Sequence, residues 1–171
     1  QKRTGIKERR YAADDEFVEI VNTGTSNCDL AGLELADFVG GATRHVFPEN
    51  TILCPGQAIV VFGGGSPDLS GSSFGGAIVQ VASTGSILLG NNGDKAILRQ
   101  SDGTEIDSVE YSSSFGADNT SITRSPDITG SFAKHDEVSA VKFSPGTEID
   151  GTPFLGCTEA PSSAPSSEPS T

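Results

Sequence analysis

Few residues of this 171-residue chain have the chemistry of a catalytic group. Residues 71–75, GSSFG, match the pattern Gly-x-Ser-x-Gly that presents a nucleophilic serine in many hydrolases. The pattern is functional where a strand enters and a helix leaves, whereas this copy lies in a Gly/Ser-rich stretch with no helical periodicity after it. We expect His45 to pack or hydrogen-bond within a strand and His135 to lie in a polar loop. The sequence therefore predicts a protein that is not an enzyme.

Signals for a cofactor or a metal ion are also weak. The glycine run at 63–65 lacks the Lys-Ser/Thr pair of a phosphate-binding loop. No Cys/His spacing is typical of zinc. Acidic residues at 14–16 and 136–137 supply the oxygen atoms that Ca²⁺ prefers, but adjacent acids on a chain usually point apart. We predict no cofactor, with Ca²⁺ as an alternative for which the sequence names no ligand set.

The three cysteines, Cys28, Cys54 and Cys157, are an odd number, so a single disulfide would leave one free thiol. Cys28 and Cys54 lie at turns inside the predicted folded region, whereas Cys157 lies where a polar tail begins. We predict a Cys28–Cys54 disulfide, with three reduced thiols as the alternative, because spacing alone does not determine pairing.

Glu19 is the one charged residue in the apolar segment 17–21, FVEIV. Four apolar residues out of five predict a strand covered on both faces. A lone buried carboxylate is energetically expensive, so we predict that a cation neutralises it. Arg124 is the first candidate and Arg44 the second, and the role of the buried pair would be structural.

Charge is distributed unevenly along the chain. Residues 1–10 contain five Lys/Arg and one acidic residue, whereas the other 161 residues contain six Lys/Arg and 22 Asp/Glu, a net charge of −16. An acidic body repels phosphate backbones and anionic lipids, so we expect no nucleic acid binding through it. No apolar run approaches the roughly 18 residues of a membrane span, so we expect no membrane insertion. The basic leader is expected to be a solvated arm.

Short apolar segments separated by turn residues fill the middle of the chain. The segment 58–62, AIVVF, predicts a second fully buried strand. Asp102-Gly103, between KAILRQ and EIDSVEY, predicts a tight hairpin, with a bulge near Asp107-Ser108 that would turn Ile106 inward. Further strands are expected at 44–47, 77–81, 120–124 and 138–143. Together these segments predict an all-β sandwich of two sheets with about eight to nine short strands.

The two ends of the chain differ from this body. We predict a basic polar arm at 1–14, the sandwich at 15–155 and a Ser/Pro-rich linker at 156–171, where the repeat APSS-APSS-EPST has no large apolar residue. Asn119 begins the triplet Asn-Thr-Ser and is a candidate glycosylation site. The triplet and the linker together favour an extracellular or cell-surface location.

Several motifs occur in an order that resembles the lamin tail domain over roughly residues 15–154, in particular its microbial secreted or surface versions. These are EFVEIVN (16–22), DLAGLELAD (29–37), HVFPENTILCPGQAIVVF (45–62), the hairpin at 91–111, TRSPDITGSF (123–132) and SPGTEIDGTPF (144–154). The resemblance implies an immunoglobulin-like fold. Leu33 stands where the family usually has Trp, and a smaller apolar residue still fills an inner position.

We therefore expect a non-catalytic interaction or structural module of a larger secreted or cell-surface protein, with a protein or a surface glycan as its partner. One alternative is an accessory domain of a secreted hydrolase, such as a nuclease or phosphatase, whose catalytic domain lies outside this chain. A second alternative is a calcium-dependent adhesion or carbohydrate-binding module. Similarity to a widely used fold predicts structure more strongly than function.

Overall fold

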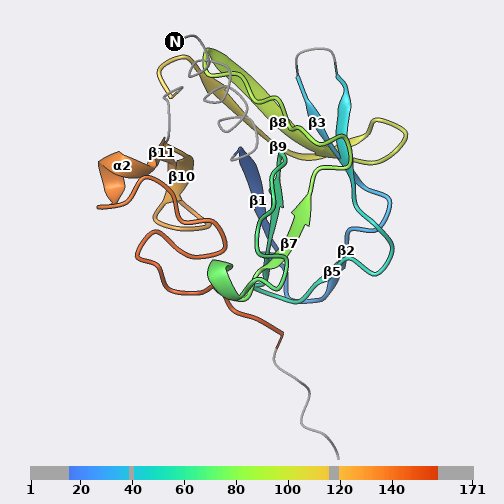
Figure 1. The fold of residues 1–171 in the computed structure, drawn as a ribbon, viewed down its shortest axis with the longest axis horizontal. Helices are drawn as coiled ribbons and strands as arrows, with labels where there is room; N and C mark the ends of the chain where they lie inside the picture. The colour runs from blue at the N-terminus through green and yellow to red at the C-terminus, as the bar shows by residue number, and fades with distance from the viewer. Residues whose placement is uncertain (1–15, 39–40, 116–119, 158–171) are drawn as a thin grey trace, which may run out of the picture.

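The computed structural model describes residues 16–38, 41–115 and 120–157 (Figure 1). Within them it contains eleven strands, a short 3-10 turn and one four-residue helix. The elements are β1 (Phe17–Val21), β2 (Cys28–Asp29), β3 (Glu34–Asp37), β4 (Thr43–Val46), β5 (Ile52–Leu53), β6 (Ala58–Phe62), η1 (Ser72–Phe74), β7 (Ile78–Val81), β8 (Gly93–Arg99), β9 (Glu105–Ser112), β10 (Ile122–Ser125), β11 (Ser131–Lys134) and α2 (His135–Val138). The predicted all-β class is confirmed. The structure has more strands than the eight to nine predicted, and two of them, β2 and β5, are only two residues long.

Two sheets form the sandwich. One has the order β1-β6-β7 and the other the order β4-β3-β8-β9, while β2 pairs with β5 and β10 with β11 in separate ladders. The strands are antiparallel except for β6 and β7, which run parallel. An intersheet core fills the space between the two sheets. It contains the buried residues Leu30, Leu35, Phe47, Leu53, Ile59, Val61, Ala82 and Ile87.

Strand β6 is buried on both faces, as its continuous apolar sequence predicts. Ile59 and Val61 point into the intersheet core, whereas Val60 points the opposite way. A second group of apolar side chains, the outer cluster, covers that opposite face. It contains Ala58, Val60, Phe62, Ala77 and Val79, with Phe17, Val21, Phe74 and Phe154 packed against it. The five residues of β6 are consequently all buried.

Strand β1 pairs along its whole length with β6, and residues directly opposite each other share a face. Val18 and Ile20 therefore contact the intersheet core. Glu19 lies opposite Val60 and faces the outer cluster. All five side chains of β1 are only partly buried, so this strand is less enclosed than its apolar sequence predicts.

The β8–β9 hairpin forms at the predicted Asp102-Gly103 turn, and Gly103 has a φ of 89° that favours glycine. Its register shifts opposite Leu98 and Arg99, which makes Ile106 the extra residue of the bulge. The bulge thus lies slightly earlier than predicted. Ile106 stays 50% exposed instead of turning inward. The extra residue of a bulge is unpaired and does not follow the alternation of side chains between the two faces of the sheet.

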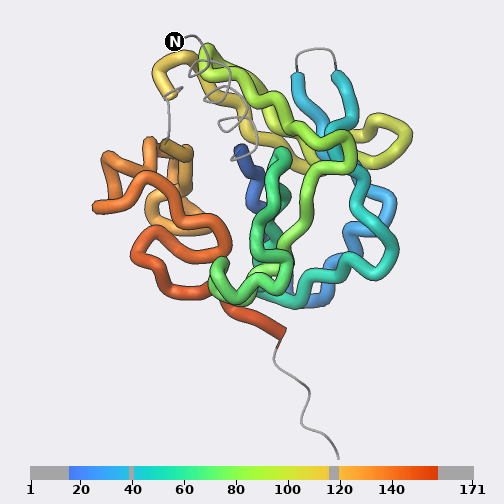
Figure 2. The backbone as a smooth tube through the Cα atoms, in the orientation of Figure 1, coloured from blue at the N-terminus to red at the C-terminus, as the bar shows by residue number. Residues whose placement is uncertain are grey.

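The chain after residue 120 forms the β10–β11 hairpin and α2, and then crosses back over the outer cluster (Figure 2). In the figure this C-terminal segment, coloured orange to red, runs beside the green turn of η1. Gly146 touches this turn so closely that a Cβ would collide with the carbonyl of Phe74. The predicted strand at 138–143 is wrong: Val138 ends α2, and Val141 and Phe143 are exposed. No described helix has the length and apolar character of a membrane span.

Candidate functional site

His45 is at the centre of the most catalysis-like group of side chains in the described chain. It lies on β4 and is 3% exposed. Its Nδ1 accepts a hydrogen bond from the Ser83 amide at 3.2 Å, so the ring proton is on Nε2, which donates to Gln80 Oε1 at 2.8 Å. Gln80 in turn donates to the Thr51 hydroxyl at 3.2 Å. Burial lowers the pKa of His45, although the Gln80 hydrogen bond partly offsets this effect.

The Ser83 hydroxyl lies 3.1 Å from His45 Nδ1, which is the contact between nucleophile and base in a serine hydrolase. The third group, however, is the neutral amide of Gln80, which stabilises an imidazolium less than the carboxylate of a Ser-His-Asp triad does. Ser83 Oγ also accepts the Val46 amide at 3.1 Å. These bonds join β4 to β7 and the residues after it, so the arrangement braces the two sheets. The prediction that His45 hydrogen-bonds within a strand is confirmed.

His135 lies elsewhere and is also structural. The predicted polar-loop position is wrong, because His135 begins α2 and is only 1% exposed. Its Nδ1 lies 2.9 Å from the Val141 carbonyl, and its Nε2 lies 2.8 Å from the Ser144 hydroxyl. The ring therefore holds the chain that follows α2. The segment is non-periodic, so no local pattern indicates that this side chain is buried.

The GSSFG segment is a short 3-10 turn rather than a strand-to-helix elbow. The Ser72 and Ser73 hydroxyls donate to Asp68 Oδ2 at 2.7 and 2.8 Å, and the Ser70 hydroxyl donates to Asp68 Oδ1 at 2.6 Å. These hydroxyl groups, Ser70 first, hold the pKa of Asp68 well below its ordinary range. The serines thus stabilise a carboxylate in an exposed loop, and no histidine is among their hydrogen-bond partners.

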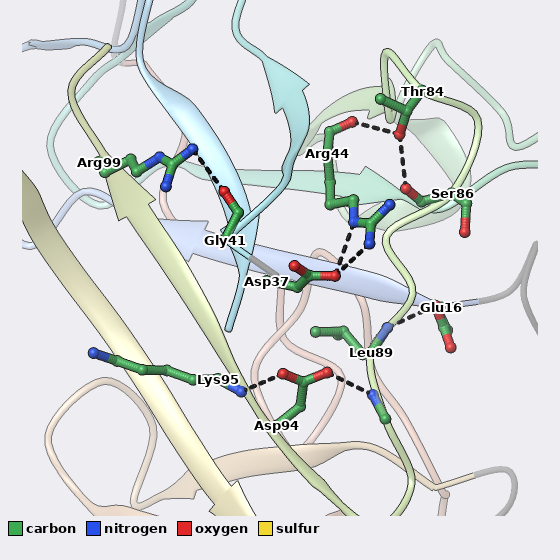
Figure 3. A network of polar contacts seen from close by, with 11 residues as sticks. Glu16, Asp37, Gly41, Arg44, Thr84, Ser86, Leu89, Asp94, Lys95 and Arg99 are labelled. Atoms are coloured by element: carbon green, nitrogen blue, oxygen red, sulfur yellow. Dashed lines mark hydrogen bonds and ion pairs between the residues drawn. The ribbon is translucent and has the colours of Figure 1, made fainter. Parts of the chain in front are cut away.

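Ion pairs link the strands of the four-stranded sheet (Figure 3). Arg44 donates to Asp37 Oδ2 through Nε at 2.9 Å and through Nη2 at 2.5 Å, and Asp37 is 2% exposed. Asp37 Oδ1 is buried without a hydrogen-bond partner. Arg99 donates to Glu34 at 3.0 Å and to the Gly41 carbonyl at 3.2 Å. These contacts fix the β3–β4 hairpin against β8.

At one end of the sheet, two carboxylates bind successive backbone amides. Glu16 Oε2 accepts the Leu89 amide at 3.2 Å, and Asp94 Oδ2 accepts the Gly90 amide at 2.9 Å (Figure 3). Burial raises the pKa of Glu16, and the Asp94 charge adds to this increase. Burial also raises the pKa of Tyr111 to about 12, with further contributions from Asp94 and Glu16. The start of β1 therefore lies beside the ends of β8 and β9.

The predicted pairing of Glu19 with Arg124 or Arg44 is wrong. Glu19 Oε2 accepts the Gly146 amide at 2.5 Å, because its face of β1 is covered by the C-terminal segment. Arg124 instead donates to the Gly130 carbonyl at 3.0 Å and lies 4.3 Å from the centre of a neighbouring phenyl ring. Arg44 instead forms an ion pair with Asp37. Burial raises the pKa of Glu19 to about 7, the Gly146 bond lowers it, and the Asp127 charge raises it further.

The predicted Cys28–Cys54 disulfide is also wrong. Cys54 bonds to Cys157, with a Cα–Cα distance of 5.2 Å, and Cys28 is free and exposed. The reason is that β2 places Cys28 opposite Leu53 rather than Cys54, while the C-terminal segment returns to the turn after β5. The two bonded cysteines are 103 residues apart, so sequence spacing gives no signal for their pairing.

The remaining candidates do not form a metal site in the described chain. Residues 14 and 15 and the glycosylation candidate Asn119 lie outside the described residues. Asp136 and Glu137 are exposed in the first turn of α2. Among the residues that the structure describes, no three His, Cys, Asp or Glu side chains are grouped so that they could hold a metal ion.

A comparison with protein families gives one match: the family model "Lamin Tail Domain" matches residues 4–113, which are 110 of the 171 residues. No curated protein is significantly similar to the chain. The matched domain is immunoglobulin-like and typically non-catalytic, which agrees with the observed sandwich. The family match, the sandwich and the motif order agree, and the chain belongs to the lamin tail domain family.

Proposed function

We propose that this chain is a non-catalytic interaction module of a larger secreted or cell-surface protein. The observation that carries the proposal is that the buried polar side chains around His45 form structural hydrogen bonds. His45, Ser83 and Gln80, which resemble a catalytic group most closely, hydrogen-bond across the sandwich and lack a carboxylate. A rigid scaffold with surface loops is a common design for recognition.

The Cys54–Cys157 disulfide supports the extracellular part of the proposal. Structural disulfides persist in secreted and surface proteins and are rare in the reducing cytosol. The bond ties Cys157, at the start of the predicted Ser/Pro linker, back to Cys54 in the sandwich. Cytosolic disulfides are usually transient and redox-active, a role that a bond between two packed segments of a fold does not suggest.

The partner that we propose is a protein or glycan receptor bound through the exposed loops of the sandwich. Residues 63–76 form one such loop, which exposes Leu69 by 63%. Because the chain beyond residue 10 has a net charge of −16, a protein partner with a basic contact surface fits best. Such complementarity mainly accelerates association and becomes weaker with added salt.

The absence of catalysis is tested on the full chain with three chromogenic substrates: a carboxylic ester, a phosphate monoester and a phosphate diester. Wild-type chain and the Ser83→Ala variant are expected to give the same rate as buffer alone. Turnover that is present in the wild type and lost in Ser83→Ala would overturn the proposal, since the Ser83 hydroxyl lies 3.1 Å from His45 Nδ1.

Two further measurements distinguish the alternatives. A ligand that binds only the folded state raises the melting midpoint. Because we predict no calcium site, thermal melts in millimolar Ca²⁺ and in chelator are expected to give the same midpoint. A calcium-dependent shift would favour the adhesion module. If the parent protein contains a hydrolase domain whose activity falls when this module is removed, the accessory role replaces the independent interaction role.

A further inference from the structure

The last described part of the chain, residues 144–157, lies over the outer cluster of the β1-β6-β7 sheet (Figure 2). We call this segment the cover. Its Phe154 side chain packs against the cluster, whereas the neighbouring Leu155 is 75% exposed. The strand residues of the cluster are enclosed, with Val60 0% and Val79 7% exposed. The cover therefore closes an apolar face while burying little apolar surface of its own.

Close backbone contacts join the cover to turns of the sandwich. A Cβ atom on Gly75 would lie 2.6 Å from the Gly146 carbonyl oxygen and 3.3 Å from Pro153 Cα. A Cβ atom on Gly56 would lie 2.9 Å from Leu155 Cβ. Gly56 and Gly75 have φ values of 78° and 63°, which favour glycine. Such contacts leave no room for side chains, so the cover fits the sandwich closely without a large apolar interface.

Many hydrogen bonds of the cover lie within the C-terminal part of the chain. The Gly151 amide donates to the Glu148 carbonyl at 2.9 Å, and the Glu148 amide donates to the Thr152 carbonyl at 2.8 Å. The Ile149 amide donates to Asp127 Oδ1, in the β10–β11 turn, at 3.1 Å. None of these three bonds involves β1, β6 or β7, so the cover can separate from the sheet without breaking them.

The non-covalent contacts between the cover and the sheet are therefore few. The Gly146 amide donates to Glu19 Oε2 on β1, and Phe154 supplies the apolar contact. Burial of one aromatic side chain offsets the entropy cost of ordering roughly one or two residues, whereas the cover has fourteen. A covalent bond at its far end supplies what these contacts lack, because it keeps the cover beside the sheet without further interactions.

The Cys54–Cys157 disulfide is this bond, and it is accessible from the surface. Cys157 is exposed, and a surface pocket of about 320 Å³ is lined by Asn27, Pro55, Leu155, Gly156 and the two cysteines. Access matters because thiol–disulfide exchange begins when a thiolate attacks a disulfide sulfur. The bond is stable until such a thiol arrives, unlike the transient disulfides of cytosolic redox proteins.

We propose that the Cys54–Cys157 bond is a latch: a dithiol opens it, the cover leaves the outer cluster, and the two sheets stay folded with an apolar face exposed. One thiolate of the dithiol attacks Cys157 Sγ, the S–S bond breaks, and Cys54 leaves as a thiolate that takes up a proton. The second thiolate of the dithiol then attacks the mixed disulfide, and Cys157 leaves and is protonated. The dithiol loses two electrons and the protein gains them. The inference goes beyond the proposed interaction role and does not depend on it.

Reduction of the full chain with dithiothreitol tests the proposal. An apolar fluorescent dye should bind weakly to the oxidised chain and give at least about fivefold more fluorescence with the reduced chain, because such dyes report exposed apolar surface. The Gly146 amide should exchange its hydrogen at least about tenfold faster after reduction. Amides of β6 should stay protected by at least about a thousandfold relative to an unstructured peptide. Three reactive thiols per chain verify that reduction is complete.

The double variant Cys54→Ser/Cys157→Ser should behave like the reduced wild type without dithiothreitol and should not respond to it. Cys28→Ser, which removes the free exposed thiol, is the matched control and should respond to dithiothreitol as the wild type does. If the fully reduced chain binds no more dye than the oxidised chain, the cover stays in place without the bond and the proposal is overturned. It is also overturned if β6 loses its protection together with Gly146, since the bond then holds the whole fold.

Discussion

At the scale of single residues, Glu19 shows how the identity of a partner depends on which face a side chain occupies. The strand alternation turns it toward the outer cluster, where the C-terminal segment supplies a backbone amide and no cation. An amide satisfies one carboxylate oxygen but does not neutralise a charge. The protonated form is therefore favoured in the folded chain, and the pKa of Glu19 rises to about 7.

This raised pKa predicts that stability depends on pH through Glu19. The folded chain holds the proton more tightly than the unfolded chain, whose pKa stays near 4.5, so the stabilisation is complete below pH 4.5 and is lost as the pH rises through about 7. The free energy of unfolding should fall by about 1.4 kcal/mol per pH unit in this window, or about 3 kcal/mol in total. Glu19→Gln should flatten the dependence and exceed wild-type stability at pH 8.

Urea denaturation of both proteins at pH 5, 6, 7 and 8 measures this effect as the difference between their unfolding free energies. The subtraction removes contributions from all other titrating groups. Glu110→Gln, which removes the same kind of charge from the exposed β9 edge, is the matched control. Parallel pH profiles for wild type and Glu19→Gln would show that Glu19 ionises in the folded chain as it does in the unfolded chain.

At the scale of elements, the β3–β4 hairpin contains the ion pair between Arg44 and Asp37, whereas the sequence pattern suggested Glu19 as a partner of Arg44. Arg44 was a candidate partner for Glu19, but the hairpin places it seven residues from Asp37, within reach of a carboxylate that is 2% exposed. Buried charges need a partner far more than exposed ones. The Lys95–Glu105 pair on the β8–β9 hairpin, where Glu105 is 45% exposed, provides a natural comparison.

Removal of each cation should therefore have very different consequences. Arg44→Met leaves the Asp37 carboxylate buried and unpaired and should lower the free energy of unfolding by roughly 3–5 kcal/mol. Lys95→Met leaves the exposed Glu105 carboxylate in contact with water and should cost roughly 0–1 kcal/mol. The double variant Arg44→Met/Asp37→Leu should recover much of the loss, because the uncompensated charge is gone. Chemical denaturation measures all three, and equal losses for Arg44→Met and Lys95→Met would contradict the argument.

The elements that could be predicted from the sequence are those defined by local patterns. Continuous apolar residues marked β6, and Asp102-Gly103 marked the β8–β9 hairpin, because burial on two faces and tight turns both leave a short-range signature. The predicted strand at 138–143 is wrong because its local apolar pattern carries no information about contacts with the rest of the chain. Its first residue ends α2, and the buried ring of His135 contacts the Val141 carbonyl in place of a strand partner.

At the scale of the whole molecule, the contacts that position the C-terminal segment had no local signature. Glu19 and Gly146 are 127 residues apart, and Cys54 and Cys157 are 103 apart. Turn residues between 144 and 157 indicate a chain leaving a domain, whereas the structure brings this stretch back over the outer cluster through Phe154. Pairings of this kind follow from the packed fold and not from spacing, which explains why the predicted disulfide was wrong.

The disulfide should be important for global stability. Loss of the bond in the double variant Cys54→Ser/Cys157→Ser should lower the free energy of unfolding by roughly 2–4 kcal/mol, because the unfolded chain gains the freedom of a long open loop. Cys28→Ser, which removes the free exposed thiol, is the control and should change stability by less than about 0.5 kcal/mol. Calorimetry measures both. A thiol reagent should modify one cysteine in the native protein, and a count of three would contradict the bond.

The same bond determines how the molecule would respond to mechanical tension between its two ends. A pull on the C-terminal end passes through the sulfur atoms of Cys157 and Cys54 directly into the chain before β6. The roughly one hundred residues enclosed between the two cysteines would bear no load and could not be drawn out, which removes about 350 Å from the extension of the stretched chain. Within the sandwich, only the portion from β1 to β5 could unfold and extend under tension. The disulfide would therefore limit how far the module can be stretched.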